Sequence, residues 1–129
     1  MQLESFSHVY GQLAYHIVLV TKYRRQVLEF KDEVKLVLNE IAIEHQMKVH
    51  AIEVLEEHVH LFISMKPTLP ISIALKFLKG KSARILFKSN PEIRQQLWGG
   101  HLWSRGTFIR SVGSVTAESI ERYIRESQS

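Results

Sequence analysis

Cysteine is absent from this chain of 129 residues. Its absence excludes a disulfide framework, a thiolate zinc site and a cysteine nucleophile, and it is compatible with a reducing cytoplasm. Long hydrophobic runs are missing as well, because the best one, Ile17 to Val20, is far too short to cross a bilayer. We therefore expect a cytoplasmic protein without a signal peptide or a membrane segment.

A strong excess of one charge is also missing. Lys and Arg number 17 against 13 Asp and Glu, which gives a formal net charge of +4 and permits a nucleic-acid partner without requiring one. The basic residues gather in two stretches, "TKYRR" (21–25) and "LKFLKGKSARILFK" (75–88), where aromatic residues lie between them. Each stretch fits either a nucleic-acid contact or a solvated helix face.

The chain has enough apolar residues, 45%, for a hydrophobic core, and its length fits one domain over residues 1–129. Hydrophobic periodicity predicts strands at 13–22, 48–55, 58–65 and about 102–109, and helices at 31–46, 71–89 (interrupted near Gly80) and 116–128. Residues 90–101 are expected to form a loop. This order predicts an α+β protein of the ferredoxin-like (RRM-like) βαββαβ type, with a four-stranded antiparallel sheet, two helices on one face and a C-terminal helix.

The stretch "EEHVHLFI" (56–63) places two histidines on one face of the predicted strand 58–65. The odd positions of this strand, Val59, Leu61, Ile63 and Met65, are expected to face the helices, and the even positions, His58, His60, Phe62 and Ser64, to face the open side of the sheet. Side chains two residues apart on a strand are parallel and about 7 Å apart at the backbone. The two imidazoles are therefore either exposed surface residues or two ligands of one metal ion.

Without cysteine, the remaining ligands of such a site would be oxygen donors or water. Nitrogen and oxygen donors with open positions suit Mg²⁺ or Mn²⁺ acting on a phosphate at least as well as structural zinc. Tyr123, between Arg122 and Arg125 on the last predicted helix, is either a packing residue or a nucleophile. A tyrosine can attack a phosphodiester when a metal polarises the phosphate.

Five stretches resemble the single-tyrosine HUH transposases (TnpA type) of small insertion sequences that move as single-stranded DNA. They are "YHIVLVTKYRRQVL", "EEHVHLFIS", "LKGKSARILF", "LWGGHLWSRGTFIRSVGSVT" and "IERYIRESQ", in the same order and spacing, from about residue 8 to 128. The resemblance implies that His58 and His60 hold the metal and that Tyr123 forms a 5′-phosphotyrosine intermediate. It also implies a prokaryotic homodimer with composite active sites in trans, acting on DNA hairpins at the element's ends.

The third metal ligand is where this chain departs from the family pattern. The family places a glutamine four residues after the tyrosine, where this chain has Ser127, and Gln128 follows five residues after Tyr123. A regular helix would turn Gln128 about 100° further round. Three alternatives remain: an unwound last turn that brings Gln128 to the metal, Glu126 as the donor, or two histidines with water. Glu57 also stands where the family usually has aspartate.

The basic stretches supply candidate phosphate contacts: Lys22, Arg24, Arg25, Lys79, Lys81, Arg84 and Arg105. His101, Trp103 and Arg105 are candidates for stacking on unpaired bases, and packing is the alternative for Trp98 and Trp103. The preferred function is a metal-dependent single-stranded DNA transposase. A hairpin-binding HUH nuclease or a catalytically decayed single-strand DNA-binding protein is the alternative, and the shifted glutamine favours the latter.

Overall fold

The computed structural model describes residues 5–6, 9–10, 12–114, 122 and 124–126. Its strands are β1 (Ser5–Phe6), β2 (Val9–Tyr10), β3 (Leu13–Val20), β4 (Lys48–Val54), β5 (His58–Met65) and β6 (Phe108–Ser114). Its α-helices are α1 (Lys31–Glu44), α2 (Ile71–Ser89) and α3 (Pro91–Gln96), and two short 3-10 helices are η1 (Lys22–Arg24) and η2 (Trp98–Gly100).

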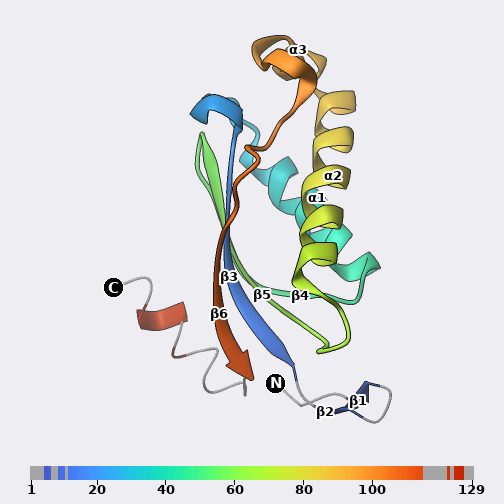
Figure 1. Ribbon diagram of the computed structural model, residues 1–129. Coiled ribbons are helices and arrows are strands. Elements are labelled where there is room, and N and C mark those ends of the chain that lie inside the picture. The colour runs from blue at the N-terminus through green and yellow to red at the C-terminus, as the bar shows by residue number, and fades with distance from the viewer. Residues whose placement is uncertain (1–4, 7–8, 11, 115–121, 123, 127–129) are drawn as a thin grey trace.

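Four strands form one antiparallel sheet in the order β4-β5-β3-β6, with α1 and α2 on the same side of it (Figure 1). The chain passes through this layer as strand, helix, strand, strand, helix, strand, so the predicted ferredoxin-like arrangement is confirmed. β5 lies between β3 and β4. The histidine pair on β5 is therefore flanked by paired strands on both sides, and neighbouring strands can supply side chains to it.

The core lies between the sheet and the two helices. Val59, Leu61 and Ile63 are fully buried, and Met65 is nearly so, which confirms the predicted alternation of β5. The buried positions of α2 recur every four residues and form one stripe along the helix: Ala74, Leu78, Ser82 and Leu86. Because the odd positions of β5 are buried against this stripe of α2 and against α1, the even positions of β5 point away from the helices.

The predicted interruption of the helix near Gly80 is wrong, because α2 runs without a break from Ile71 to Ser89. Gly80 is exposed, and a Cβ atom at this position would meet nothing within 4 Å. Glycine in a helix interior costs about 1 kcal/mol relative to alanine, which the buried stripe on the opposite face of α2 outweighs.

The predicted strand at about 102–109 is also wrong in its position, since β6 spans Phe108–Ser114 and residues 91–96 form α3. The stretch around Trp103 is extended, but it makes only an isolated bridge with Thr21. Hydrogen bonds from the Lys22 N–H to the Leu102 carbonyl oxygen (2.8 Å) and from the Ser104 N–H to the Val20 carbonyl oxygen (2.7 Å) hold this stretch at the end of β3. The chain then turns at residues 104–106 before β6 begins.

The second face of the sheet has a small apolar cluster of its own. Ala14 and Phe62 are buried there, with Ala51, Val112 and Ile124 packed against them. Arg122 and Ile124–Glu126 are the described part of the predicted helix 116–128, and they are helical. The even-numbered side of β5 is therefore partly covered, with Phe62 at 4% exposure and Ser64 at 1%.

No helix among the described residues has the length and apolarity that a membrane crossing needs.

Candidate active site

The two histidines of β5 meet through their ε-nitrogens. His58 Nε2 and His60 Nε2 are 3.2 Å apart, and the two rings stand at 75° to each other. Two imidazole nitrogens that each lie about 2.1 Å from one ion, at an angle of about 90–110°, would be about 3.0–3.4 Å apart. The spacing of the pair therefore suits two ligands of one metal ion.

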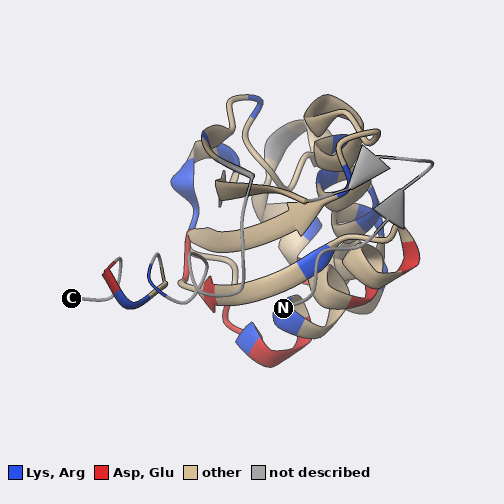
Figure 2. Ribbon diagram, turned by 90° about the horizontal axis from the view of Figure 1, so that it is seen from below, with Lys and Arg blue, Asp and Glu red and all other residues tan. Residues whose placement is uncertain are grey.

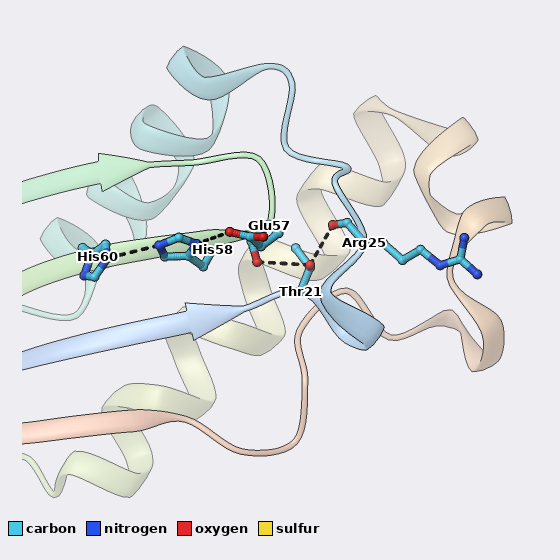
Figure 3. Close-up of polar contacts among 5 residues, drawn as sticks. All are labelled: Thr21, Arg25, Glu57, His58 and His60. Carbon is cyan, nitrogen blue, oxygen red and sulfur yellow. Dashed lines mark hydrogen bonds and ion pairs between the residues drawn. The ribbon is translucent and has the colours of Figure 1, made fainter.

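Glu57 orients the first histidine. Its Oε1 contacts His58 Nδ1 at a distance of 2.6 Å (Figure 3), and both side chains are partly buried. A carboxylate only accepts hydrogen bonds, so His58 carries a proton on Nδ1 and, in a neutral ring, leaves the lone pair on Nε2. A carboxylate behind a metal-binding histidine is the usual partner in such sites.

Thr21 fixes the backbone that carries Glu57. The Thr21 N–H donates to the carbonyl oxygen of Glu57 at 2.9 Å, and its buried hydroxyl lies 3.1 Å from the same oxygen and 2.7 Å from the carbonyl oxygen of Arg25. Thr21 thus ties the link between β4 and β5 to the turn after β3. Figure 3 shows the Arg25 side chain extending away from the histidine pair.

His16 on β3 contacts the second histidine. Its Nε2 lies 3.2 Å from His60 Nδ1, and the ring centroids are 5.4 Å apart. Burial, His60 and Arg110, in that order, lower the pKa of His16. The register pairs Val18 with His60 and His16 with Phe62, which makes His16 and His60 diagonal neighbours on one face. Sequence reasoning missed His16, and its only signal was its even position on β3, since the register was unknown.

A further histidine on this face has a different environment. His50 Nε2 lies 2.7 Å from Ser64 Oγ, which donates to Gln12 Oε1 at 2.9 Å. Burial and then the charge of Lys48 lower the pKa of His50 to about 4. His50 is therefore a neutral, hydrogen-bonded residue at neutral pH and is not part of the histidine pair.

Tyr123, Ser127 and Gln128 lie outside the described residues, so the predicted nucleophile and third ligand are not placed. Glu126 is described and exposed. Within the described part of the chain, no group of three or more His, Asp or Glu side chains is arranged to hold a metal.

A pocket of about 450 Å³ lies between α2 and the loop that follows η2. Its lining includes basic and aromatic residues together with small and apolar ones: Lys22, Lys79, Ala83, Gly100, His101, Leu102, Trp103, Ser104 and Arg105. A second pocket of about 540 Å³ shares Ala83 and Gly100 with it and is lined by Arg84, Lys88 and Arg94 among others. Neither lining contains an acidic residue, so both favour an anion.

Lysine and arginine residues are spread over several elements of the fold (Figure 2), and the predicted DNA contacts differ in their surroundings. The structure brings Lys22, Lys79 and Arg105 into the first pocket and Arg84 into the second. Lys81 instead forms an ion pair with Glu44 at 3.1 Å. Arg24 and Arg25 are exposed on the turn after β3.

Lys79 and Trp103 have structural partners that the sequence did not reveal. The Lys79 ammonium donates to the carbonyl oxygens of Ser104 and Arg105 and to Thr107 Oγ1, and burial lowers its pKa. Trp103 is 6% exposed, and its Nε1–H donates to Ser82 Oγ at 2.8 Å. Trp103 is therefore a packing residue, which was the alternative to stacking on a base. The Trp98 side chain lies outside the described part.

Comparison with known proteins gives consistent matches over nearly the whole chain. The family described as "Transposase IS200 like" matches residues 9–127. The ISDra2 transposase TnpA of Deinococcus radiodurans is 42% identical over 119 residues, which cover 91% of this chain and 84% of that protein. The transposase of insertion sequence element IS200 from Salmonella typhimurium is 28% identical over 124 residues, which cover 95% and 81% of the two chains.

Two solved structures are similar to this fold. A crystal structure described as a transposase from Deinococcus radiodurans R1 has a TM-score of 0.77 and 37% identity, covering 98% of this chain and 97% of that one. A REP-associated tyrosine transposase bound to a REP hairpin has a TM-score of 0.59, covering 96% and 68% of the chains, and its 13% identity shows the fold alone. The resemblance read from the motifs is confirmed, and the chain belongs to the IS200-like transposases.

Proposed function

We propose that this protein is a metal-dependent transposase that cleaves and rejoins the ends of a mobile element as single-stranded DNA, through a 5′-phosphotyrosine intermediate. Its family membership supplies the general activity of a transposase. The observation that carries the metal dependence is the 3.2 Å approach of His58 Nε2 to His60 Nε2, with Glu57 and His16 occupying the outer ring nitrogens.

His58 and His60 would hold Mg²⁺ or Mn²⁺, with Gln128, Glu126 or water supplying the remaining ligands. Such an ion, when bound, withdraws charge from the phosphate that is attacked. The phenolic oxygen of Tyr123 forms a bond to phosphorus, the bond from phosphorus to the 3′ oxygen breaks, and that oxygen leaves as a 3′-hydroxyl. The reverse attack by a 3′-hydroxyl releases the tyrosine and rejoins a strand without an added energy source.

The proposed substrate is a DNA hairpin with an adjoining single strand. A protein of the same fold is described as bound to a REP hairpin, which supports this choice. Lys22, Arg84 and Arg105 line two neighbouring pockets without acidic residues, where phosphates would be attracted. We also propose that the active protein is a homodimer in which the tyrosine of one subunit serves the histidine pair of the other.

Covalent capture of DNA tests this function. A labelled strand that carries the element's own end and hairpin is incubated with Mn²⁺ and run on a denaturing protein gel. The wild type is expected to give a slow band that disappears in Tyr123→Phe and His60→Ala and when the metal is chelated. Tyr23→Phe, at an exposed tyrosine, and His50→Gln, at a histidine outside the pair, are the matched controls and should keep the band.

The alternative is a catalytically decayed protein that binds hairpins without cutting them. The position of Gln128, one residue later than the family pattern, is the observation in its favour. Retention of the hairpin in a native gel, with no covalent band under either Mg²⁺ or Mn²⁺, would support the alternative and contradict the proposed function.

A further inference from the structure

Four side chains form a continuous line of close polar contacts across the face of the sheet that points away from α1 and α2. Glu57 Oε1 lies 2.6 Å from His58 Nδ1, His58 Nε2 lies 3.2 Å from His60 Nε2, and His60 Nδ1 lies 3.2 Å from His16 Nε2. They come from the link before β5, from β5 and from β3. Both ring nitrogens of His58 and of His60 are therefore engaged, and His16 is the partner that completes the line.

The carboxylate fixes the direction of these hydrogen bonds. Because Glu57 only accepts, His58 donates from Nδ1, and its Nε2 is an acceptor when the ring is neutral. His60 must then donate from Nε2 to make the second contact, which leaves His60 Nδ1 as an acceptor. His16 Nε2 must donate to it. For neutral rings, all three contacts are hydrogen bonds in this one arrangement only.

Metal binding requires a different arrangement of the same protons. A divalent cation held by the pair needs the lone pairs of both ε-nitrogens, so His60 must carry its proton on Nδ1. That N–H then points at His16 Nε2, which lies 3.2 Å away and must now accept. His16 can accept if its own proton is on Nδ1, and each ring still carries one proton.

We propose that His16 is a positioning residue of the metal site, which changes from hydrogen-bond donor to acceptor toward His60 Nδ1 and so allows His60 to present Nε2 to a divalent cation. The inference rests on the proposed function, since it assigns His58 and His60 as the ligands. Glu57 positions the other ligand: it holds His58 in the same tautomer with and without the metal. An imidazole suits position 16 because each of its nitrogens can donate or accept.

Nuclear magnetic resonance of the full-length protein without DNA tests this directly, because long-range proton–nitrogen couplings distinguish the two tautomers of a histidine ring. Without metal, we expect His16 and His60 to carry their protons on Nε2 and His58 on Nδ1. On saturation with Mg²⁺, His16 and His60 are both expected to change to the Nδ1 form while His58 does not change. A proton that stays on His60 Nε2 or on His16 Nε2 in the presence of Mg²⁺ would overturn the proposal.

Metal affinity gives the second readout. Loss of a residue that orients a metal-ligating histidine lowers metal affinity about 10–100-fold, and we expect this for Mn²⁺ binding by His16→Ala, measured by electron paramagnetic resonance. His16→Gln should regain most of the affinity, since an amide offers both a donor and an acceptor. His50→Gln is the control, because His50 lies on the same sheet face but bonds to Ser64 instead.

The outcomes separate this inference from the proposed function. Wild-type Mn²⁺ affinity in a folded His16→Ala protein would overturn the role of His16 while leaving strand cleavage untouched. If His16→Ala does not fold, as seen by circular dichroism, the tautomers of the wild type and the affinity of His16→Gln still decide the matter. A tautomer change on metal binding without any covalent DNA product would support the role of His16 and contradict strand transfer.

Discussion

Lys79 joins α2 to the loop before β6, and its loss should loosen that loop. Its ammonium donates to Ser104 O at 2.9 Å, to Arg105 O at 3.3 Å and to Thr107 Oγ1 at 2.9 Å. The change to test is Lys79→Met, which keeps most of the apolar stem and removes all three hydrogen bonds. The matched control is Lys76→Met, at an exposed lysine on the same helix.

The expected loss of stability follows from these contacts. A hydrogen bond from a charged donor contributes about 1.5–3 kcal/mol when it is buried, but these are partly open to solvent. Burial also lowers the pKa of Lys79, so the charged form loses some hydration on folding. We therefore expect the free energy of unfolding to decrease by about 1–2 kcal/mol. This is well below the sum expected for three fully buried hydrogen bonds.

Urea denaturation and amide hydrogen exchange measure this effect. For a domain of this size, each 1 kcal/mol corresponds to about 3–5 °C in the melting temperature. Exchange should become faster in residues 101–107 and stay unchanged in α1, because only the loop loses partners. Equal stability of Lys79→Met and Lys76→Met, with equal exchange in the loop, would show that Lys79 does not hold the loop in place.

Three further predictions concern the core and the buried polar groups. Ser82→Ala leaves the buried Trp103 Nε1–H without its acceptor, so we expect a loss of about 1–3 kcal/mol in urea denaturation, and an unchanged midpoint would contradict that assignment. Leu61→Ala removes a fully buried side chain and should cost about 2–5 kcal/mol, measured in the same way and compared with the exposed Leu36→Ala. His50 has a pKa of about 4 when folded against 6.5 for the unperturbed group, so its contribution to stability is complete above pH 6.5 and is lost as the pH falls toward 4. His50→Gln should therefore lose less stability than the wild type between pH 7.5 and pH 5, and equal losses would show that His50 is not the group responsible.

Strand β5 could be predicted to the residue because its two faces differ in the sequence. Every odd position is apolar and buried, and His58 begins the strand directly after two acidic residues. The same alternation places both histidines on the face of the sheet that points away from the helices. Alternation of this kind depends only on neighbours in the chain, and one sequence is enough to read it.

The misplaced elements depended on contacts between distant parts of the chain. Leu102 and Trp103 are buried like strand residues, but they contact the end of β3 and α2 rather than forming a ladder. Local propensity predicts a break at Gly80 because glycine is a poor helix former. Propensity contains no information on the exposed position of this residue on α2.

The role of His16 at the site also depends on a contact between distant parts of the chain. Its position beside His60 follows from the register between β3 and β5, and a shift of one residue would have placed it on the opposite face. The sequence therefore identified the histidine pair, through its motif, and missed the residue that accompanies it from the neighbouring strand.

We propose that this transposase forms a covalent bond from Tyr123 to DNA and needs the histidine pair to do so. The most direct measurement is the mass of the protein after incubation with the element's end and Mn²⁺, followed by mapping of the modified peptide. We predict an added mass equal to that of the 5′-phosphorylated cleavage product less one water, attached at Tyr123, and no added mass in His58→Ala or His60→Ala. An unchanged mass in the wild type, or attachment at a residue other than Tyr123, would contradict this mechanism.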